Sequence, residues 1–99
     1  MLRIIAKNFI KPEQTAKAES LFRELIAASL EDSGCLEYRL HKDAAEPGLY
    51  VFIEEWADRE SHAKHEASEH FKRLFPQIGA LAAKPGEALF LHDEVKGKK

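Results

Sequence analysis

The segment spanning residues 49–56 constrains the fold most, because both of its faces are apolar. Alternate positions of an extended strand point to opposite sides of a sheet. One side carries Leu49, Val51 and Ile53, and the other carries Tyr50, Phe52 and Trp56. Such a strand lies in the middle of a sheet that is covered on both faces. A chain of 99 residues has material for one covering layer. We therefore expect a second copy to cover the other face, in a symmetric homodimer.

The residues before this segment predict a strand, a helix and a second strand. Residues 2–10 are rich in isoleucine and phenylalanine and predict a strand, which ends before Lys11-Pro12-Glu13. Apolar residues then recur at helical spacing as far as Ser33-Gly34, where the glycine suits a left-handed cap. Cys35–His41 alternates between apolar and polar residues, which predicts a half-buried strand with Leu36, Tyr38 and Leu40 on one face.

The residues after it predict two short helices and a last strand. Asp58 and Ser68 are residue types that begin helices, because their side chains accept hydrogen bonds from free backbone N–H groups. Pro76 lies inside the apolar stripe of the second helix, so we expect a kink or a restart there. Lys84-Pro85-Gly86 predicts a turn, followed by a strand over Ala88–Val95.

The resulting order is strand, helix, strand, strand, helix, strand. This is the order of the ferredoxin-like βαββαβ fold, an α+β class with an antiparallel four-stranded sheet. Right-handed crossovers place both helical segments on the same face of that sheet. We expect a single domain over residues 1–95 and a charged, flexible tail over residues 96–99.

The composition argues against several classes of partner. A formal net charge of −2 and well-spread basic residues give no electrostatic surface for nucleic acid. No apolar run reaches the roughly 18 residues of a membrane span, and the N-terminus has no signal-peptide core. The single cysteine, Cys35, cannot form an intramolecular disulfide, and we expect it to be a small buried apolar residue. We therefore expect a cytoplasmic protein with no nucleic-acid or membrane partner.

The most distinctive motif follows the apolar strand. It reads E-x-W-x-D from Glu54, then a histidine at position 65, then S-x-H-F over residues 68–71. With Lys11-Pro12 and the Gly34–Tyr38 segment, it resembles the antibiotic biosynthesis monooxygenase family over nearly the whole chain. The resemblance implies a dimeric α+β barrel with one pocket per subunit, between sheet and helices. It also implies oxygen chemistry that often uses no metal or organic cofactor, in which a deprotonated phenol or quinol reduces dioxygen directly.

The resemblance also implies the site residues. His65 is expected to be the base or proton shuttle, Asn8 the oxyanion donor and Glu54 the group that orients the site. The expected substrate-binding residues are Trp56 as an aromatic wall, with Tyr38, Phe52, His70 and Phe71. Each also has a structural interpretation: Trp56 as a core residue, the histidines as polar surface or capping groups, and Glu54 as a structural hydrogen-bonding group.

Two departures from the family narrow the expected activity. Heme-degrading relatives have a second tryptophan where His65 stands and an iron-ligating histidine ten residues later, where this chain has Phe75. Heme degradation is therefore disfavoured. Some anthrone oxygenases carry an asparagine at the position of Phe52, which weakens the assignment to polyketide tailoring.

The spacing of the histidines bears on whether the chain could bind a metal ion. His62 and His65, and likewise Glu66 and His70, are spaced to share a helix face. The order H-x-x-H-E is not the H-E-x-x-H zinc pattern, and the sequence offers no clear third ligand. The sequence therefore predicts no metal and no other cofactor.

The sequence favours one function and leaves two alternatives open. The first is a cofactor-independent monooxygenase of a small quinol-like or polyphenolic substrate. The second is an isomerase or degradation enzyme for a small signalling sugar phosphate, which would need lysines or arginines converging on the pocket. The third is a non-catalytic dimeric module that binds a small aromatic molecule.

Overall fold

The computed structural model describes residues 1–98 and has the predicted ferredoxin-like order. A short 3₁₀ turn, Pro12–Gln14, precedes the first helix. The elements are β1 (Leu2–Ile10), α1 (Thr15–Ser29), β2 (Cys35–Lys42), β3 (Leu49–Trp56), α2 (Arg59–Glu66), α3 (Glu69–Gly79) and β4 (Ala82–Leu91). In this part of the chain no helix is long and apolar enough to cross a membrane.

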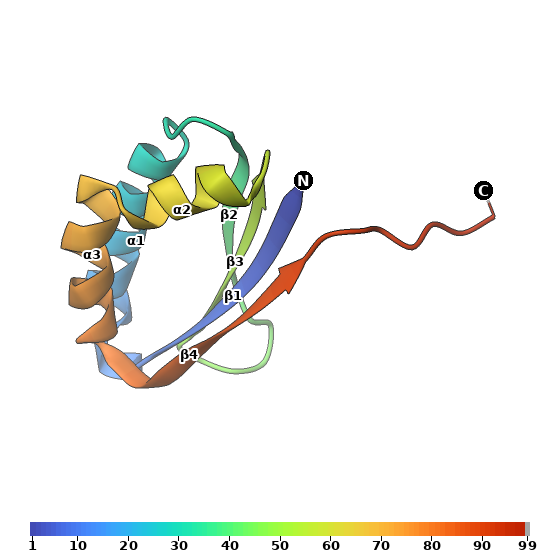
Figure 1. The fold of residues 1–99 in the computed structure, drawn as a ribbon. Coiled ribbons are helices and arrows are strands. Elements are labelled where there is room, and N and C mark those ends of the chain that lie inside the picture. The colour runs from blue at the N-terminus through green and yellow to red at the C-terminus, as the bar shows by residue number, and fades with distance from the viewer. Residues whose placement is uncertain (99) are drawn as a thin grey trace.

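The four strands form one antiparallel sheet in the order β2-β3-β1-β4. The three helices lie on the same face of that sheet, as right-handed crossovers require (Figure 1). Residues 92–98, after β4, lead away from the body of the molecule (Figure 1). The doubly apolar strand β3 is central, with β1 and β2 on either side of it.

The core lies between the sheet and the helices. On β3 the side chains of Tyr50, Phe52 and Trp56 are buried on the helix side. Phe22 of α1 packs on two of them, with ring centroids 5.1 Å from Tyr50 and 5.4 Å from Phe52. Leu74 of α3 is buried in the same cluster. Helices α1 and α3 thus contribute their apolar stripes to one aromatic-rich layer, and the one buried residue of α2 is His65.

The opposite face of the sheet has no covering layer within residues 1–98. Val51 and Ile53 of β3 and Ile5 of β1 are partly exposed there. At the edge, Leu89 and Leu91 of β4 are 59% and 42% exposed. This apolar open face is the observation on which the expected homodimer depends, and the dimer stays a prediction.

One side chain of β2 was placed on the wrong face. We expected Leu36 to share a buried face with Tyr38 and Leu40, but Leu36 is 56% exposed. The pairing with β3 shifts register between Cys35 and Glu37, so a bulge turns Leu36 outward and brings Cys35 opposite Trp56. A bulge inserts one residue into strict alternation, and the sequence pattern does not reveal it.

The predicted bounds of the last strand were also wrong. The strand begins at Ala82 rather than Ala88, ends at Leu91 rather than Val95, and passes through the Lys84-Pro85-Gly86 segment. Its register with β1 shifts on both sides of Phe9. Because β4 is an edge strand, Pro85 is tolerated in an irregular stretch of it. A Cβ atom at Gly86 would lie 2.7 Å from the carbonyl oxygen of Lys7, so the close approach of the strands needs glycine.

The helical region also differs from the prediction at Pro76. We expected a kink or a restart there, and the helix does not restart, because α3 continues through Pro76 to Gly79. The carbonyl of Lys72, four residues earlier, is the group that loses its partner. Both residues are exposed, so water can satisfy that carbonyl. The break between the two helices falls at Ala67 and Ser68, where Ser68 was predicted to begin the second helix.

Candidate active site

A cavity of about 260 Å³ lies between the sheet and the helices. Aromatic and aliphatic side chains make up most of its wall, and a few polar groups converge on it. Among the apolar lining residues are Ile4, Phe22, Leu25, Phe52, Phe71, Phe75, Ile78 and Phe90. The polar lining residues are Lys7, Asn8, Tyr38, Glu54, His62, His65, Glu66 and Glu87. This is the usual make-up of a small-molecule site.

His65 is the most deeply buried polar group of this wall, at 2% exposure. It lies in the last turn of α2, a helix that begins where Asp58 accepts a hydrogen bond from the backbone N–H of Ser61. Its ring is 4.7 Å from that of Trp56 and 4.9 Å from that of Phe71. Burial lowers the pKa of His65, and a hydrogen bond to Asp32 opposes that effect.

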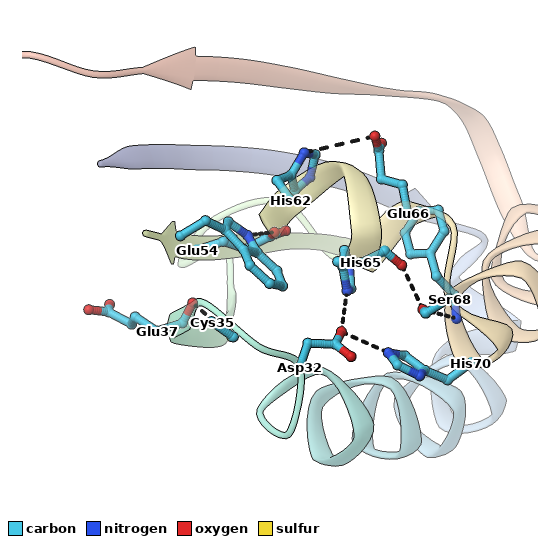
Figure 2. A network of polar contacts seen from close by, with 11 residues as sticks. Asp32, Cys35, Glu37, Glu54, His62, His65, Glu66, Ser68 and His70 are labelled. Atoms are coloured by element: carbon cyan, nitrogen blue, oxygen red, sulfur yellow. Dashed lines mark hydrogen bonds and ion pairs between the residues drawn. The ribbon is translucent and has the colours of Figure 1, made fainter. Parts of the chain in front are cut away.

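Asp32 joins this site from the loop after α1, and the sequence analysis did not identify it. Its Oδ2 atom lies 2.8 Å from Nδ1 of His65 and 2.9 Å from Nε2 of His70. Figure 2 shows the carboxylate between the two rings. Asp32 precedes these histidines by 33 and 38 residues, so no local spacing links them. The packing of α3 against both α1 and α2 brings the three together.

Glu54 is a buried carboxyl group in the cavity wall. Its Oε1 atom accepts a hydrogen bond from Nε1 of Trp56 at 3.0 Å, and the residue is 6% exposed. Burial raises the pKa of Glu54 to about 7, and the hydrogen bond from Trp56 only partly offsets this. Near neutral pH, Glu54 is therefore a mixture of the acid and the carboxylate.

The other predicted residues fall into two groups. Asn8, Tyr38, Phe52 and Phe71 line the cavity with His65 and Glu54. Burial raises the pKa of the Tyr38 phenol, which stays neutral. Trp56 and His70 are not among the lining residues. Trp56 is fully buried behind the ring of His65, and His70 lies on the far side of Asp32.

His62 also lines the cavity, although the sequence assigned it no role. Its ring centroid is 5.7 Å from Trp56 and 5.6 Å from Phe90. Its Nδ1 atom is 3.8 Å from the carboxylate of Glu66, as drawn in Figure 2. Burial lowers the pKa of His62, while Glu66 acts in the opposite direction. Its spacing of three from His65 was the signal that both face inward.

The comparisons with known proteins agree with this architecture. The sequence profile described as antibiotic biosynthesis monooxygenase matches residues 1–77. The chain belongs to that family, whose name supports a general monooxygenase-like role. No curated protein matches the sequence significantly.

Several solved structures are similar along nearly their full length. One crystal structure of an antibiotic biosynthesis monooxygenase is 43% identical, with a TM-score of 0.92 over 97% of this chain and 100% of that chain. A conserved protein from Methanosarcina mazei Go1 is 31% identical, with a TM-score of 0.91 over 94% and 92% of the two chains. A protein from Pseudomonas aeruginosa is 31% identical, with a TM-score of 0.85 over 95% and 94%.

Proposed function

We propose that this protein is a cofactor-independent monooxygenase of a small quinol-like or polyphenolic molecule. The observation that carries the proposal is His65, whose ring forms part of an apolar cavity wall while its Nδ1 atom is held by Asp32. Such chemistry needs a base, donors for a developing oxyanion and an aromatic enclosure. Each of these has a candidate among the lining residues.

His65 is the proposed base. A carboxylate beside Nδ1 favours the tautomer with the proton on that nitrogen, which leaves the lone pair on Nε2. The two ring nitrogens point in nearly opposite directions, so Nε2 is directed away from Asp32. Because burial lowers the pKa of His65, the ring is neutral at physiological pH and ready to accept a proton. Asp32 acts as a positioning residue that sets the tautomer and orientation.

Glu54 and Asn8 are the proposed donors to substrate oxygen. Oε1 of Glu54 already accepts the hydrogen bond from Nε1 of Trp56. In the molecules in which Glu54 is protonated, a proton on Oε2 is therefore available to donate to the substrate. The Asn8 side chain lies in the same wall, and its amide N–H groups are of the right type to donate to a substrate oxygen. Phe52 and Phe71 supply flat apolar surface for a ring.

The reaction balances without an added reductant, because the substrate supplies the electrons. His65 removes a proton from the phenolic O–H, and the electron-rich ring carbon transfers electrons to dioxygen and forms a C–O bond. Cleavage of the O–O bond then leaves one oxygen atom on the product and releases the other as water. A quinol plus dioxygen thus gives a hydroxyquinone plus water.

The two alternatives are less well supported. A phosphorylated sugar needs converging cations, yet the cavity lining contains one basic residue, Lys7, beside the carboxyl groups of Glu54, Glu66 and Glu87. A purely structural role for His65 would need the hydrogen bond to Asp32 and the packing on Trp56 and Phe71, but not its place in the cavity wall. A non-catalytic module would bind an aromatic molecule without consuming oxygen.

We also propose that the working form is a cytoplasmic homodimer. The open face of the sheet carries partly exposed Ile5, Val51 and Ile53, and pairing with the same face of a second copy would bury them. The single cysteine supports a reducing compartment.

The test is oxygen uptake by metal-stripped protein against a panel of quinols and anthrones. The proposal predicts uptake of one dioxygen per substrate, no hydrogen peroxide, and one product oxygen derived from ¹⁸O₂. Stoichiometric peroxide would indicate an oxidase instead. Tight binding of panel members without oxygen uptake would favour the non-catalytic module.

A further inference from the structure

We propose that Asp32, His65 and His70 form a binding site for one divalent transition-metal ion of the class of Zn²⁺, Co²⁺ or Fe²⁺. Asp32 and His70 do not line the cavity, so the site lies behind the cavity wall. Of the three ligand residues, only His65 also lines the cavity. The sequence analysis considered two pairs of possible ligands, His62 with His65 and Glu66 with His70, and found no third ligand. The fold places His65 beside His70 and supplies the third ligand from a distant loop.

The positions of the donor atoms carry this proposal. The three residues each offer one ligand atom, and these atoms all lie within 4.8 Å of one another. The carboxylate of Asp32 touches both rings, through Nδ1 of one and Nε2 of the other (Figure 2). The His65 side chain is 1% exposed, while those of Asp32 and His70 are 18% and 16% exposed. An ion can therefore enter from the side of Asp32 and His70.

The backbone that carries the two histidines is already ordered. Ser68 lies between them, and its hydroxyl donates to the carbonyl of His65 at 2.6 Å while accepting from the N–H of Phe71 at 3.2 Å. The ring of His65 is also held between those of Trp56 and Phe71. Because folding fixes these groups, a metal ion would order few of its ligands on binding.

Two imidazole nitrogens and one carboxylate oxygen suit borderline transition metals rather than Mg²⁺ or Ca²⁺, which prefer all-oxygen sites. Three protein ligands leave at least one position for water. Metal–ligand bonds of about 2.0–2.1 Å at tetrahedral angles separate ligand atoms by about 3.3 Å, so the two contacts of Asp32 would lengthen by roughly half an ångström. Rotation of the partly exposed Asp32 and His70 side chains can lengthen these two contacts by that amount.

Binding of a metal ion would change which ring nitrogen of His65 and of His70 carries the proton. Without metal, both rings can donate an N–H to Oδ2 of Asp32. A metal-bound imidazole nitrogen is unprotonated, so the ion moves the proton of each neutral ring to its other nitrogen. Metal binding therefore transfers the proton of His65 from Nδ1 to Nε2.

The first test titrates the full-length, metal-stripped protein with Co²⁺ in visible absorption and with Zn²⁺ in calorimetry. We expect one ion per chain. Asp32→Asn and His70→Ala should each weaken the affinity by at least about 100-fold, because loss of even an outer-shell partner costs 10–100-fold. The exposed His41 and the cavity residue His62 provide the matched controls, and His41→Ala and His62→Ala should keep the wild-type affinity. Circular dichroism checks that each variant is folded.

The second test needs no variant. In ¹⁵N NMR of the wild type, His65 should carry its proton on Nδ1 without metal and on Nε2 at saturating Zn²⁺. An unchanged tautomer overturns the proposal even if an ion binds elsewhere. No binding by the wild type, or binding that survives both Asp32→Asn and His70→Ala, also overturns it. Loss of binding only in His62→Ala would assign the ion to the His62–Glu66 pair and would refute the site.

Discussion

Replacing Glu54 by glutamine should make the protein more stable at pH 8 and leave its stability nearly unchanged at pH 4. The glutamine has nearly the same shape, and its amide oxygen can still accept the hydrogen bond from Nε1 of Trp56. The substitution therefore removes the ionisable group and little else. It measures what ionising a buried carboxyl group costs in this fold.

The magnitude follows from the pKa of Glu54. That pKa is about 7 in the folded protein, against an ordinary value of 4.5 in the unfolded chain. The folded state therefore binds more protons between these values, and the wild type loses stability as the pH rises through them. A pKa difference of about 2.5 corresponds to about 3 kcal/mol, because one pKa unit is worth about 1.4 kcal/mol. This penalty is absent below pH 4.5, where Glu54 is protonated in both states, and complete above pH 7.

The assay is urea denaturation of wild type and Glu54→Gln at several pH values, at one protein concentration so that any dimer affects both equally. The difference in unfolding free energy should grow from near zero at pH 4 to about 3 kcal/mol in favour of the variant at pH 8. A difference that does not change with pH would refute the pKa reasoning. A variant that is less stable than wild type at pH 8 would show that the carboxylate is stabilised by groups that the structure does not place near it.

Three further predictions concern the core, the assembly and the metal. Trp56→Ala should lower the unfolding free energy by about 3–5 kcal/mol, because the side chain is fully buried; a loss near zero in urea denaturation would contradict its core position. Light scattering at micromolar concentration should give the wild type a mass of about 22 kDa, twice the chain mass of 11.2 kDa. The Ile53→Asp variant, which places a charge on the open face, should have the mass of a monomer. A monomeric wild type would remove the case for pairing. Zn²⁺ should inhibit oxygen uptake by metal-stripped protein and a chelator should restore it, because the ion would occupy Nδ1 of His65 and the ring proton would move to Nε2, the nitrogen of the proposed base; stimulation by Zn²⁺ would contradict the proposed base.

Local patterns predicted most of the fold. The alternation of β3 and the capping residues Asp58 and Ser68 depend on neighbours in sequence, and both carry over to the structure. The errors in the strands have one cause, which is that pairing between strands is not local. The bulge that exposes Leu36 depends on β3, and the passage of β4 through Pro85 depends on its edge position beside β1.

In the candidate site, too, local spacing predicted some features, while others depend on tertiary packing. The nine-residue spacing between Trp56 and His65 brings both to one end of the sheet, and their rings are in contact. The sequence could not show that Trp56 lies behind His65 rather than in the cavity wall, because that depends on how α2 packs. Nor could it select Asp32 from 17 acidic residues, since only the packed helices bring it to the histidines.

The central claim is that His65 accepts the substrate proton in a reaction that needs no cofactor. The most direct measurement is the initial rate of oxygen uptake by metal-stripped wild type, His65→Ala and the exposed control His41→Ala, on one substrate that the wild type converts. We predict that His65→Ala lowers turnover by roughly 10²–10⁴-fold while it remains folded, and that His41→Ala matches the wild type. Normal turnover by folded His65→Ala would contradict the account.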